Sequence, residues 1–254
     1  MKLLRRAFRR LFPRRLDPVM DATLVRSAED ERCAAIYRAT VPEGDPFVLG
    51  RFDEALRWRH VLDSFAGREG CLLDLGAGNG AVELAFVSAG RTIVGVDPIW
   101  NETARQLHRA AGLPLRRVVA AAEALPFRDG TFAHALCLET VEHLARPHEA
   151  GREMMRVVGG TILLTTPPRL RYLLAPDPHF GIRGLLLLPA RLQERVAARR
   201  GFRGPHHYVD RIYWTVGQIA AMFPFSAVER IYTRSRLPRR LFWDAVVLRR
   251  MNRL

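Results

Sequence analysis

The sequence has few cysteines, a single lysine and no long apolar segment. Its 254 residues include three scattered cysteines, Cys33, Cys71 and Cys137. Their separation excludes a disulfide framework or a cysteine-rich metal centre and indicates buried thiols in a reducing compartment. The apolar runs are far shorter than the roughly 20 residues that span a bilayer. We find no internal repeat, so we expect one domain with a sizeable core.

Positive charge is concentrated at the two ends of the chain. Of the net charge of +14, residues 1–18 carry +6 and residues 230–254 carry +7. The central residues therefore sum to only +1. A centre that is nearly neutral offers no basic groove to a nucleic acid. We expect the charged ends, and not the central fold, to make any contact with an anionic partner.

The first fifteen residues combine apolar and basic side chains at helical spacing. The apolar positions share one face, and four arginines fill the rest: Leu3, Leu4, Ala7, Phe8, Leu11 and Phe12 against Arg5, Arg6, Arg9 and Arg10. This pattern predicts a basic amphipathic helix suited to an anionic membrane interface. Three alternatives stay open: packing on the protein's own core, a cleaved presequence, or contact with nucleic acid. A secretory signal is not expected, because no apolar stretch of about 7–15 residues follows the charges.

The most informative stretch is Leu-Leu-Asp-Leu-Gly-Ala-Gly-Asn-Gly at residues 72–80. A short apolar run, broken only by Asp74, stops at three alternating glycines, which predicts a buried strand and a tight turn. A helical stretch at 81–89 and a second strand at 92–96 follow. That strand ends in Asp97, 21 positions after Gly76. An acid at this distance is typical of the ribose-binding position in a nucleotide-binding βαβ unit.

Asp74 separates two interpretations of the glycines, because Gly76-x-Gly78-x-x-Ala81 also satisfies the dinucleotide fingerprint. An acid at the strand tip is unfavourable beside a pyrophosphate but useful beside the ammonium of methionine. The pattern Asp-x-Gly-x-Gly-x-Gly resembles motif I of the class I S-adenosylmethionine (SAM) methyltransferases. The resemblance covers roughly residues 50–250. It implies an α/β fold, a Rossmann-like seven-stranded sheet with helices on both faces, and SAM as the cofactor.

Five further segments fit the remaining strands of such a sheet: 115–121, 133–138, 159–166, 225–232 and 241–248, the last as an antiparallel edge. The run at 133–138 is almost wholly apolar, as expected when helices cover both faces. We expect four segments in the chain. These are a basic helix and helical cap (1–50), a SAM-binding core (51–166), an acceptor-pocket or lid insert (167–210) and the end of the same domain (211–254).

The resemblance also implies which residues hold the cofactor. They lie in motif I, after the second and third strands, at the end of the fourth strand and in the preceding helix: Asp74, Gly76, Ala77, Gly78, Gly80, Asp97, Pro98, Ala122, Glu123, Leu138 and Arg57.

Glu139-x-x-Glu142-His143 resembles a trio in the ubiquinone-pathway O-methyltransferase family, where it is linked to a divalent cation. The resemblance implies that Glu139, Glu142 and His143 bind Mg²⁺, which would lower the pKa of an acceptor hydroxyl. The sequence at 165–168, Thr-Thr-Pro-Pro, departs from the Asn-Arg type of that family. Glu-His pairs after the fourth strand also occur in methyltransferases without a metal, so this alternative stays open.

The segment from 167 to 210 is long for a connection inside a compact domain, and such segments are usually functional. Its apolar and arginine-rich composition suggests a lid over a hydrophobic acceptor, with a purely structural subdomain as the alternative. A carbon or hydroxyl acceptor also needs a base. His143 is our first candidate, and His179, His206 and His207 of the insert are the others; each can equally have a structural role.

These features favour an enzyme that transfers a methyl group to an oxygen of a small or lipidic acceptor at a membrane surface. We expect a cytoplasmic protein, peripheral at the inner membrane face, held there by its basic ends. One alternative is an RNA methyltransferase that uses the same ends, although Glu-Thr-Val-Glu at 139–142 replaces the Asn/Asp-Pro-Pro-aromatic motif of amino-methylating enzymes. Another is a scaffold with this fold and no activity. The sequence predicts no particular oligomeric state.

Overall fold

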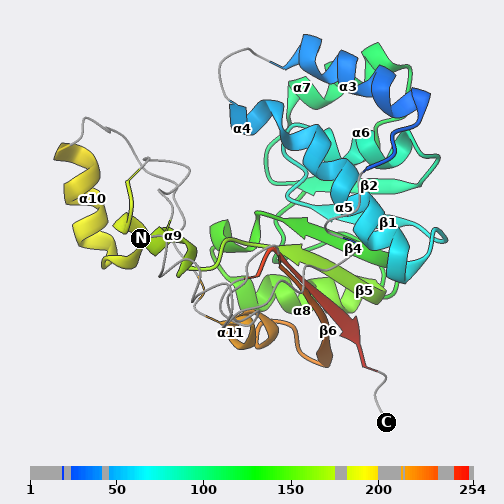
Figure 1. Ribbon diagram of the computed structural model, residues 1–254. Helices are drawn as coiled ribbons and strands as arrows, with labels where there is room; N and C mark the ends of the chain where they lie inside the picture. Colours follow the sequence, from blue (N-terminus) through cyan, green and yellow to red (C-terminus); the bar gives the residue numbers. More distant parts are fainter. Residues whose placement is uncertain are drawn as a thin grey trace, which may run out of the picture.

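The computed structural model describes residues 19, 24–41, 46–174, 182–199, 213, 215–233 and 243–251. Their strands form one seven-stranded sheet in the order β3-β2-β1-β4-β5-β7-β6 (Figure 1). The strands are β1 (Leu72–Leu75), β2 (Ile93–Asp97), β3 (Arg117–Val119), β4 (Phe132–Leu138), β5 (Val158–Thr165), β6 (Ser226–Tyr232) and β7 (Ala245–Arg250). The first five are parallel, and β7 runs antiparallel between β5 and β6. The predicted α/β sheet is confirmed.

Helices precede, connect and follow these strands. They are α3 (Ala28–Thr40), α4 (Pro46–Leu49), α5 (Arg51–Ala66), α6 (Ala81–Val87), α7 (Glu102–Ala111), α8 (Pro147–Val157), α9 (Arg171–Leu174), α10 (Ala190–Arg199) and α11 (Val216–Ala220), with 3₁₀ turns η1 (Val141–His143) and η2 (Leu185–Leu187). The helix α10 lies within the segment 167–210. In Figure 1 it lies well away from the sheet, beside α9.

The two faces of the sheet bury separate apolar clusters because successive side chains of a strand point to opposite sides. On one face, Leu73 and Leu75 of β1 pack in a cluster with residues of α8 and α11. On the other, Leu72 packs with Trp58 of α5 and Phe86 of α6. A third cluster joins α3 and α7 to the outer sides of α5 and α6. Both faces are covered, which accounts for the apolar composition of the parallel strands.

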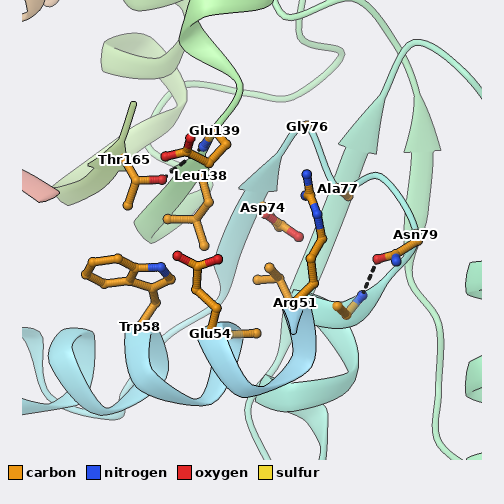
Figure 2. A pocket seen from close by; sticks show the side chains of 13 residues that line it. Arg51, Glu54, Trp58, Asp74, Gly76, Ala77, Asn79, Leu138, Glu139 and Thr165 are labelled. Carbon is orange, nitrogen blue, oxygen red and sulfur yellow. Dashed lines mark hydrogen bonds between the residues drawn. The ribbon is translucent and has the colours of Figure 1, made fainter. Parts of the chain in front are cut away.

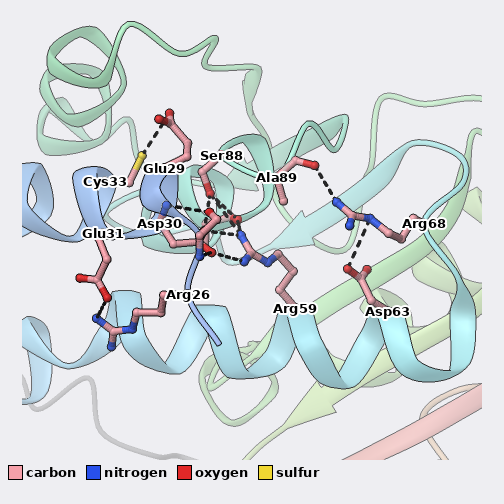
Figure 3. A network of polar contacts seen from close by, with 12 residues as sticks. Arg26, Glu29, Asp30, Glu31, Cys33, Arg59, Asp63, Arg68, Ser88 and Ala89 are labelled. Carbon is pink, nitrogen blue, oxygen red and sulfur yellow. Dashed lines mark hydrogen bonds and ion pairs between the residues drawn. The ribbon is translucent and has the colours of Figure 1, made fainter. Parts of the chain in front are cut away.

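Polar contacts fix the helix α3 on α5 and α6 (Figure 3). Ser27 and Asp30 form a capping box at its first turn. Asp30 also accepts two hydrogen bonds of 2.8 Å from the guanidinium of Arg59 on α5. Burial opposes ionisation, but the Arg59 and Ser27 hydrogen bonds lower the pKa of Asp30 to about 2. The pair therefore ties α3 to α5 through a charged contact that is almost completely shielded from water.

The structure shifts some sequence expectations by a few residues. The last strand is β7 at Ala245–Arg250, whereas the sequence pattern placed its start at 241; residues 241 and 242 lie outside the described residues. The Trp243 indole donates to the Thr166 carbonyl at 2.9 Å, and Asp244 pairs with Arg171 at 2.7 Å. Cys33 and Cys137 are buried as expected, whereas Cys71 lies just before β1 and is only half-buried.

Several expectations lie outside the described residues. They include the amphipathic helix of residues 1–18 and the candidate bases His179, His206 and His207. Among the helices that the structure describes, none has the length and apolar character needed to cross a membrane.

Candidate functional site

A cavity lies at the carboxyl edge of β1 and β4, against α5 (Figure 2). This edge is where open α/β sheets bind their ligands. The lining residues come from α5, the glycine-rich turn, the start of α6 and the ends of β4 and β5: Arg51, Glu54, Ala55, Trp58, Asp74, Gly76, Ala77, Asn79, Ala81, Val82, Leu138, Glu139 and Thr165.

One face of α5 supplies the outer wall of the cavity. Arg51, Glu54, Ala55 and Trp58 recur at the i, i+3, i+4 and i+7 spacing that places side chains on one side of a helix. Arg57, the arginine expected here, is not among the lining residues, because its position turns it to another side of α5. The structure therefore brings Arg51 to the cavity in its place. The helical spacing places these four residues on one side of α5, but the sequence alone does not show which side faces the cavity.

The glycine-rich turn at residues 76–80 has the backbone conformation that its sequence predicts. All three glycines have positive φ values, +79° at Gly76, +48° at Gly78 and +85° at Gly80. At Gly76 a Cβ atom would also lie 2.2 Å from Oγ1 of Thr140, and at Gly80 it would lie 2.8 Å from Cβ of Ala104. Only glycine fits this turn, which joins β1 to α6 and is confined by Thr140 after β4 and by Ala104 of α7.

Side chains from the neighbouring strands β2 and β3 bind the backbone of the glycine-rich turn. Arg117 of β3 donates to the carbonyl oxygens of Gly78 at 2.7 Å and Ala77 at 3.2 Å, and it pairs with Glu83 of α6. Asp97 at the end of β2 accepts from the Gly78 N–H at 3.0 Å through one oxygen and from the Ile99 N–H at 3.0 Å through the other. Each oxygen retains a further acceptor site. Asp97 thus lies beside the turn, in the place expected of the ribose-binding acid.

The other predicted cofactor residues lie at different distances from this centre. Leu138, Asp74, Gly76 and Ala77 line the cavity. Pro98 is exposed just beyond Asp97, and Ala122 is buried after β3. Glu123 accepts a hydrogen bond from the Arg146 N–H at 3.1 Å. Roles for Pro98, Ala122 and Glu123 stay predictions.

The cavity is rich in carboxyl groups. Glu54, Asp74 and Glu139 line it, against the single guanidinium of Arg51 among its lining side chains. Asp74 is 1% exposed, and its Oδ2 atom has no hydrogen-bond partner within the described part of the chain. Burial and the neighbouring charge of Glu83 raise the pKa of Asp74 well above its usual range, although Arg117 opposes the shift. Such surroundings suit a cationic ligand group.

Glu139 occupies a strained position at the end of β4. Its φ of +49° is in the left-handed region that non-glycine residues rarely adopt and that often marks functional sites. Its N–H bonds to Oγ1 of Thr165 at 2.9 Å and to the Thr165 carbonyl at 3.0 Å, which anchor it to β5. Burial raises the pKa of Glu139 to about 7, against the lowering effect of Thr165.

The predicted metal trio does not fit the structure, because Glu142 is buried within reach of the charge of Glu139 whereas His143 is exposed. The 3₁₀ turn η1 carries Glu142 into the core, where burial and the charge of Glu139 raise its pKa to about 8, and leaves His143 exposed. No group of three His, Cys, Asp or Glu side chains in the described residues could hold a metal ion. As a candidate base, His143 is likewise absent from the cavity lining, whose acidic groups are Glu54, Asp74 and Glu139.

Comparisons with known proteins agree with this geometry. A family model described as a methyltransferase domain matches residues 73–164. An uncharacterized methyltransferase of Mycolicibacterium gilvum is 34% identical over 186 residues, which cover 66% of this chain and 69% of the relative. A Mycobacterium marinum protein of the same description is 35% identical over 59% of this chain and 58% of its own length.

Solved structures share the fold at low sequence identity. The 1,6-didemethyltoxoflavin-N1-methyltransferase of Burkholderia thailandensis, with bound 1,6-didemethyltoxoflavin and S-adenosylhomocysteine, has a TM-score of 0.51 at 17% identity. The match covers 91% of this chain and 93% of that one. The PH0226 protein from Pyrococcus horikoshii OT3 has a TM-score of 0.57 at 17% identity, over 89% of this chain and 100% of that one.

Proposed function

Because this chain belongs to the class I SAM-dependent methyltransferases, we propose that it methylates an oxygen atom of a small or lipidic acceptor at a membrane surface. The residues of the site fit the cofactor. The turn at Gly76 leaves no room for a Cβ atom, and the buried Oδ2 of Asp74 lacks a partner. When bound, SAM supplies a methyl group on a positively charged sulfur.

The chain's own residues would bind and orient this cation. Asp97 has acceptor capacity left for ribose hydroxyls. The positive charge of SAM would favour the ionised form of Asp74, so that Glu54 and Asp74 provide a negative environment for the ammonium and sulfonium groups. The Arg51 guanidinium is the natural partner for a carboxylate. Methyl transfer by in-line displacement depends mainly on such positioning, with reacting atoms about 3–3.5 Å apart.

The observation that carries the choice of oxygen is Glu139. A hydroxyl acceptor must lose its proton, and the best base has a pKa near the working pH. Glu139 lines the cavity, is fixed through its backbone to Thr165, and has a pKa of about 7. Its carboxylate is thus the group on this chain that would take the proton from the acceptor hydroxyl.

The lipidic character of the acceptor is supported by the segment after β5. Within it, Ile182, Leu185, Leu188 and Val196 form a small apolar cluster of their own. On α10, Leu192 is 42% exposed and is flanked by the exposed Arg191 and Arg195. Apolar side chains beside arginines suit the surface of an anionic membrane. The basic residues at 1–18 and 230–254 add to the same attraction.

The test is to incubate the purified protein with methyl-labelled SAM and a lysate of the source cells, and then to partition the products between organic solvent and water. We expect label in the solvent phase. The variant Glu139→Gln should lower the turnover by about 10²-fold or more, whereas the surface variant Glu102→Gln on α7 should not. Nuclease-sensitive label in the aqueous phase would replace this proposal with a nucleic-acid methyltransferase, and an unchanged rate for Glu139→Gln would reject Glu139 as the base.

A further inference from the structure

Tyr37 connects the helix α3, on which it lies, to the cofactor site. Its ring is 1% exposed and stacks on Phe52 with the ring centroids 5.7 Å apart. Its hydroxyl donates to the Val48 carbonyl at 2.8 Å and accepts from Nδ2 of Asn79 at 2.8 Å. The family model matches only residues 73–164, so α3 and Tyr37 lie outside it.

Asn79 belongs to the glycine-rich turn and lines the cavity. Its Oδ1 accepts the N–H of Ala81, the first residue of α6, at 3.2 Å. Because this contact requires the amide oxygen, the amide nitrogen must face Tyr37. The two hydrogen bonds together fix the orientation of the Asn79 side chain, which Figure 2 shows at the turn.

The helix α3, which carries the Tyr37 hydroxyl, is fixed in place by contacts with the neighbouring helices. Arg59 of α5 binds Asp30 through two hydrogen bonds, and Ser88 after α6 donates to the same carboxylate at 3.2 Å (Figure 3). Arg32 of α3 donates to the carbonyl oxygen of Ala111 on α7 at 2.9 Å. The helix is thereby tied to α5, α6 and α7, the three helices around the cofactor half of the sheet.

We propose that Tyr37 is a positioning residue for the cofactor: its hydroxyl holds Asn79, and through Asn79 the turn at residues 76–80, in the shape that receives SAM. Arg117 holds the same turn through the carbonyl groups of residues 77 and 78, whereas Tyr37 holds it through the side chain of Asn79. The inference concerns cofactor binding and is independent of the acceptor proposed above.

The first experiment measures the affinity of the full chain for SAM and for S-adenosylhomocysteine by titration calorimetry. Tyr37→Phe keeps the stacked ring and removes only the hydroxyl. We expect about tenfold weaker binding of both ligands, equivalent to about 1.4 kcal/mol. Tyr232→Phe is the matched control, because it removes a hydroxyl from an equally buried tyrosine in the cluster on the sheet face near α5. Its affinities should equal those of the unmodified protein.

A double-mutant cycle with Asn79→Ala separates positioning from a general loss of stability. If Tyr37 acts through Asn79, Tyr37→Phe should cause no further loss of affinity in the Asn79→Ala background. Additive losses would overturn the proposal, as would unchanged SAM affinity in Tyr37→Phe with only a lower melting temperature. Asn79→Ala alone must also weaken binding, and wild-type affinity in that variant would reject the proposal even if Tyr37→Phe did not fold. These readouts need no acceptor, so they do not depend on the outcome of the labelling test.

Discussion

The buried carboxyl groups of this protein fall into two groups that differ in their partners. Asp30 pairs with Arg59, and Glu83 pairs with Arg117. By contrast, Asp74 Oδ2 at the cavity and Glu142 Oε2 on the turn η1 after β4 have no hydrogen-bond partner among the described residues. The first group joins helices and strands to one another. The second lies at the edge where parallel strands bind ligands.

The difference indicates which part of the molecule is complete without a ligand. A buried polar atom without a partner is costly and needs an explanation. The pairs Asp30–Arg59 and Glu83–Arg117 are complete within the protein. Because Arg117 also holds the turn that receives the cofactor, that turn is formed before the cofactor binds. At the ends of β1 and β4, burial raises the pKa values of Asp74 and Glu142, which means that the folded protein disfavours their charged forms. A cationic cofactor and an acceptor would relieve part of it.

The largest effect should follow from breaking a pair of the first group. Arg117→Met leaves the Glu83 carboxylate buried at 1% side-chain exposure without its guanidinium. It also leaves two carbonyl groups of the glycine-rich turn without their donor. We expect the free energy of unfolding in urea to fall by about 3–5 kcal/mol. The double variant Glu83→Gln/Arg117→Met should recover much of this loss, and wild-type stability in the single variant would show that the pair is not essential.

An intermediate effect should appear as a pH dependence of the Asp30–Arg59 pair. The pKa of Asp30 is lowered to about 2 in the folded protein, against about 3.9 in an unfolded chain. The stabilisation is therefore fully present above about pH 4 and is lost as the pH falls through about 2, and its size is about 2 kcal/mol. Urea unfolding of the wild type and of Asp30→Asn at pH 7 and pH 2.5 tests this. The difference between the two proteins should shrink at the lower pH, and a constant difference would contradict the assignment.

The sequence was sufficient for most of the fold because local signals and the global arrangement agree. The apolar run before Gly76 is β1, and the run that ends in Asp97 is β2. Contacts between distant residues were not predicted. For example, Asp244 pairs with Arg171, which the sequence pattern of an apolar strand could not foresee.

The site was less predictable, because it depends on which face of a helix meets the sheet. Arg51 and Arg57 both lie on α5, and only the packing of Trp58 against the sheet decides that Arg51 enters the cavity. The contact between Tyr37 and Asn79 joins residues 42 positions apart, so no local pattern announces it. Likewise, Glu142 and His143 are adjacent on the turn η1, but the side chain of Glu142 is buried and that of His143 is exposed.

An effect of opposite sign should come from the second group. An unfolded glutamate ionises near pH 4.3, whereas burial and the charge of Glu139 raise the pKa of Glu142 to about 8. The wild type therefore loses stability as the pH rises between these values, and Glu142→Gln does not. In urea unfolding we expect the stability of the variant to gain on that of the wild type as the pH rises from 4 to 8, with no such gain below pH 4. A loss of stability like that of Asp30→Asn would mean that Glu142 is paired after all, and the contrast between the two groups of carboxyl groups would then disappear.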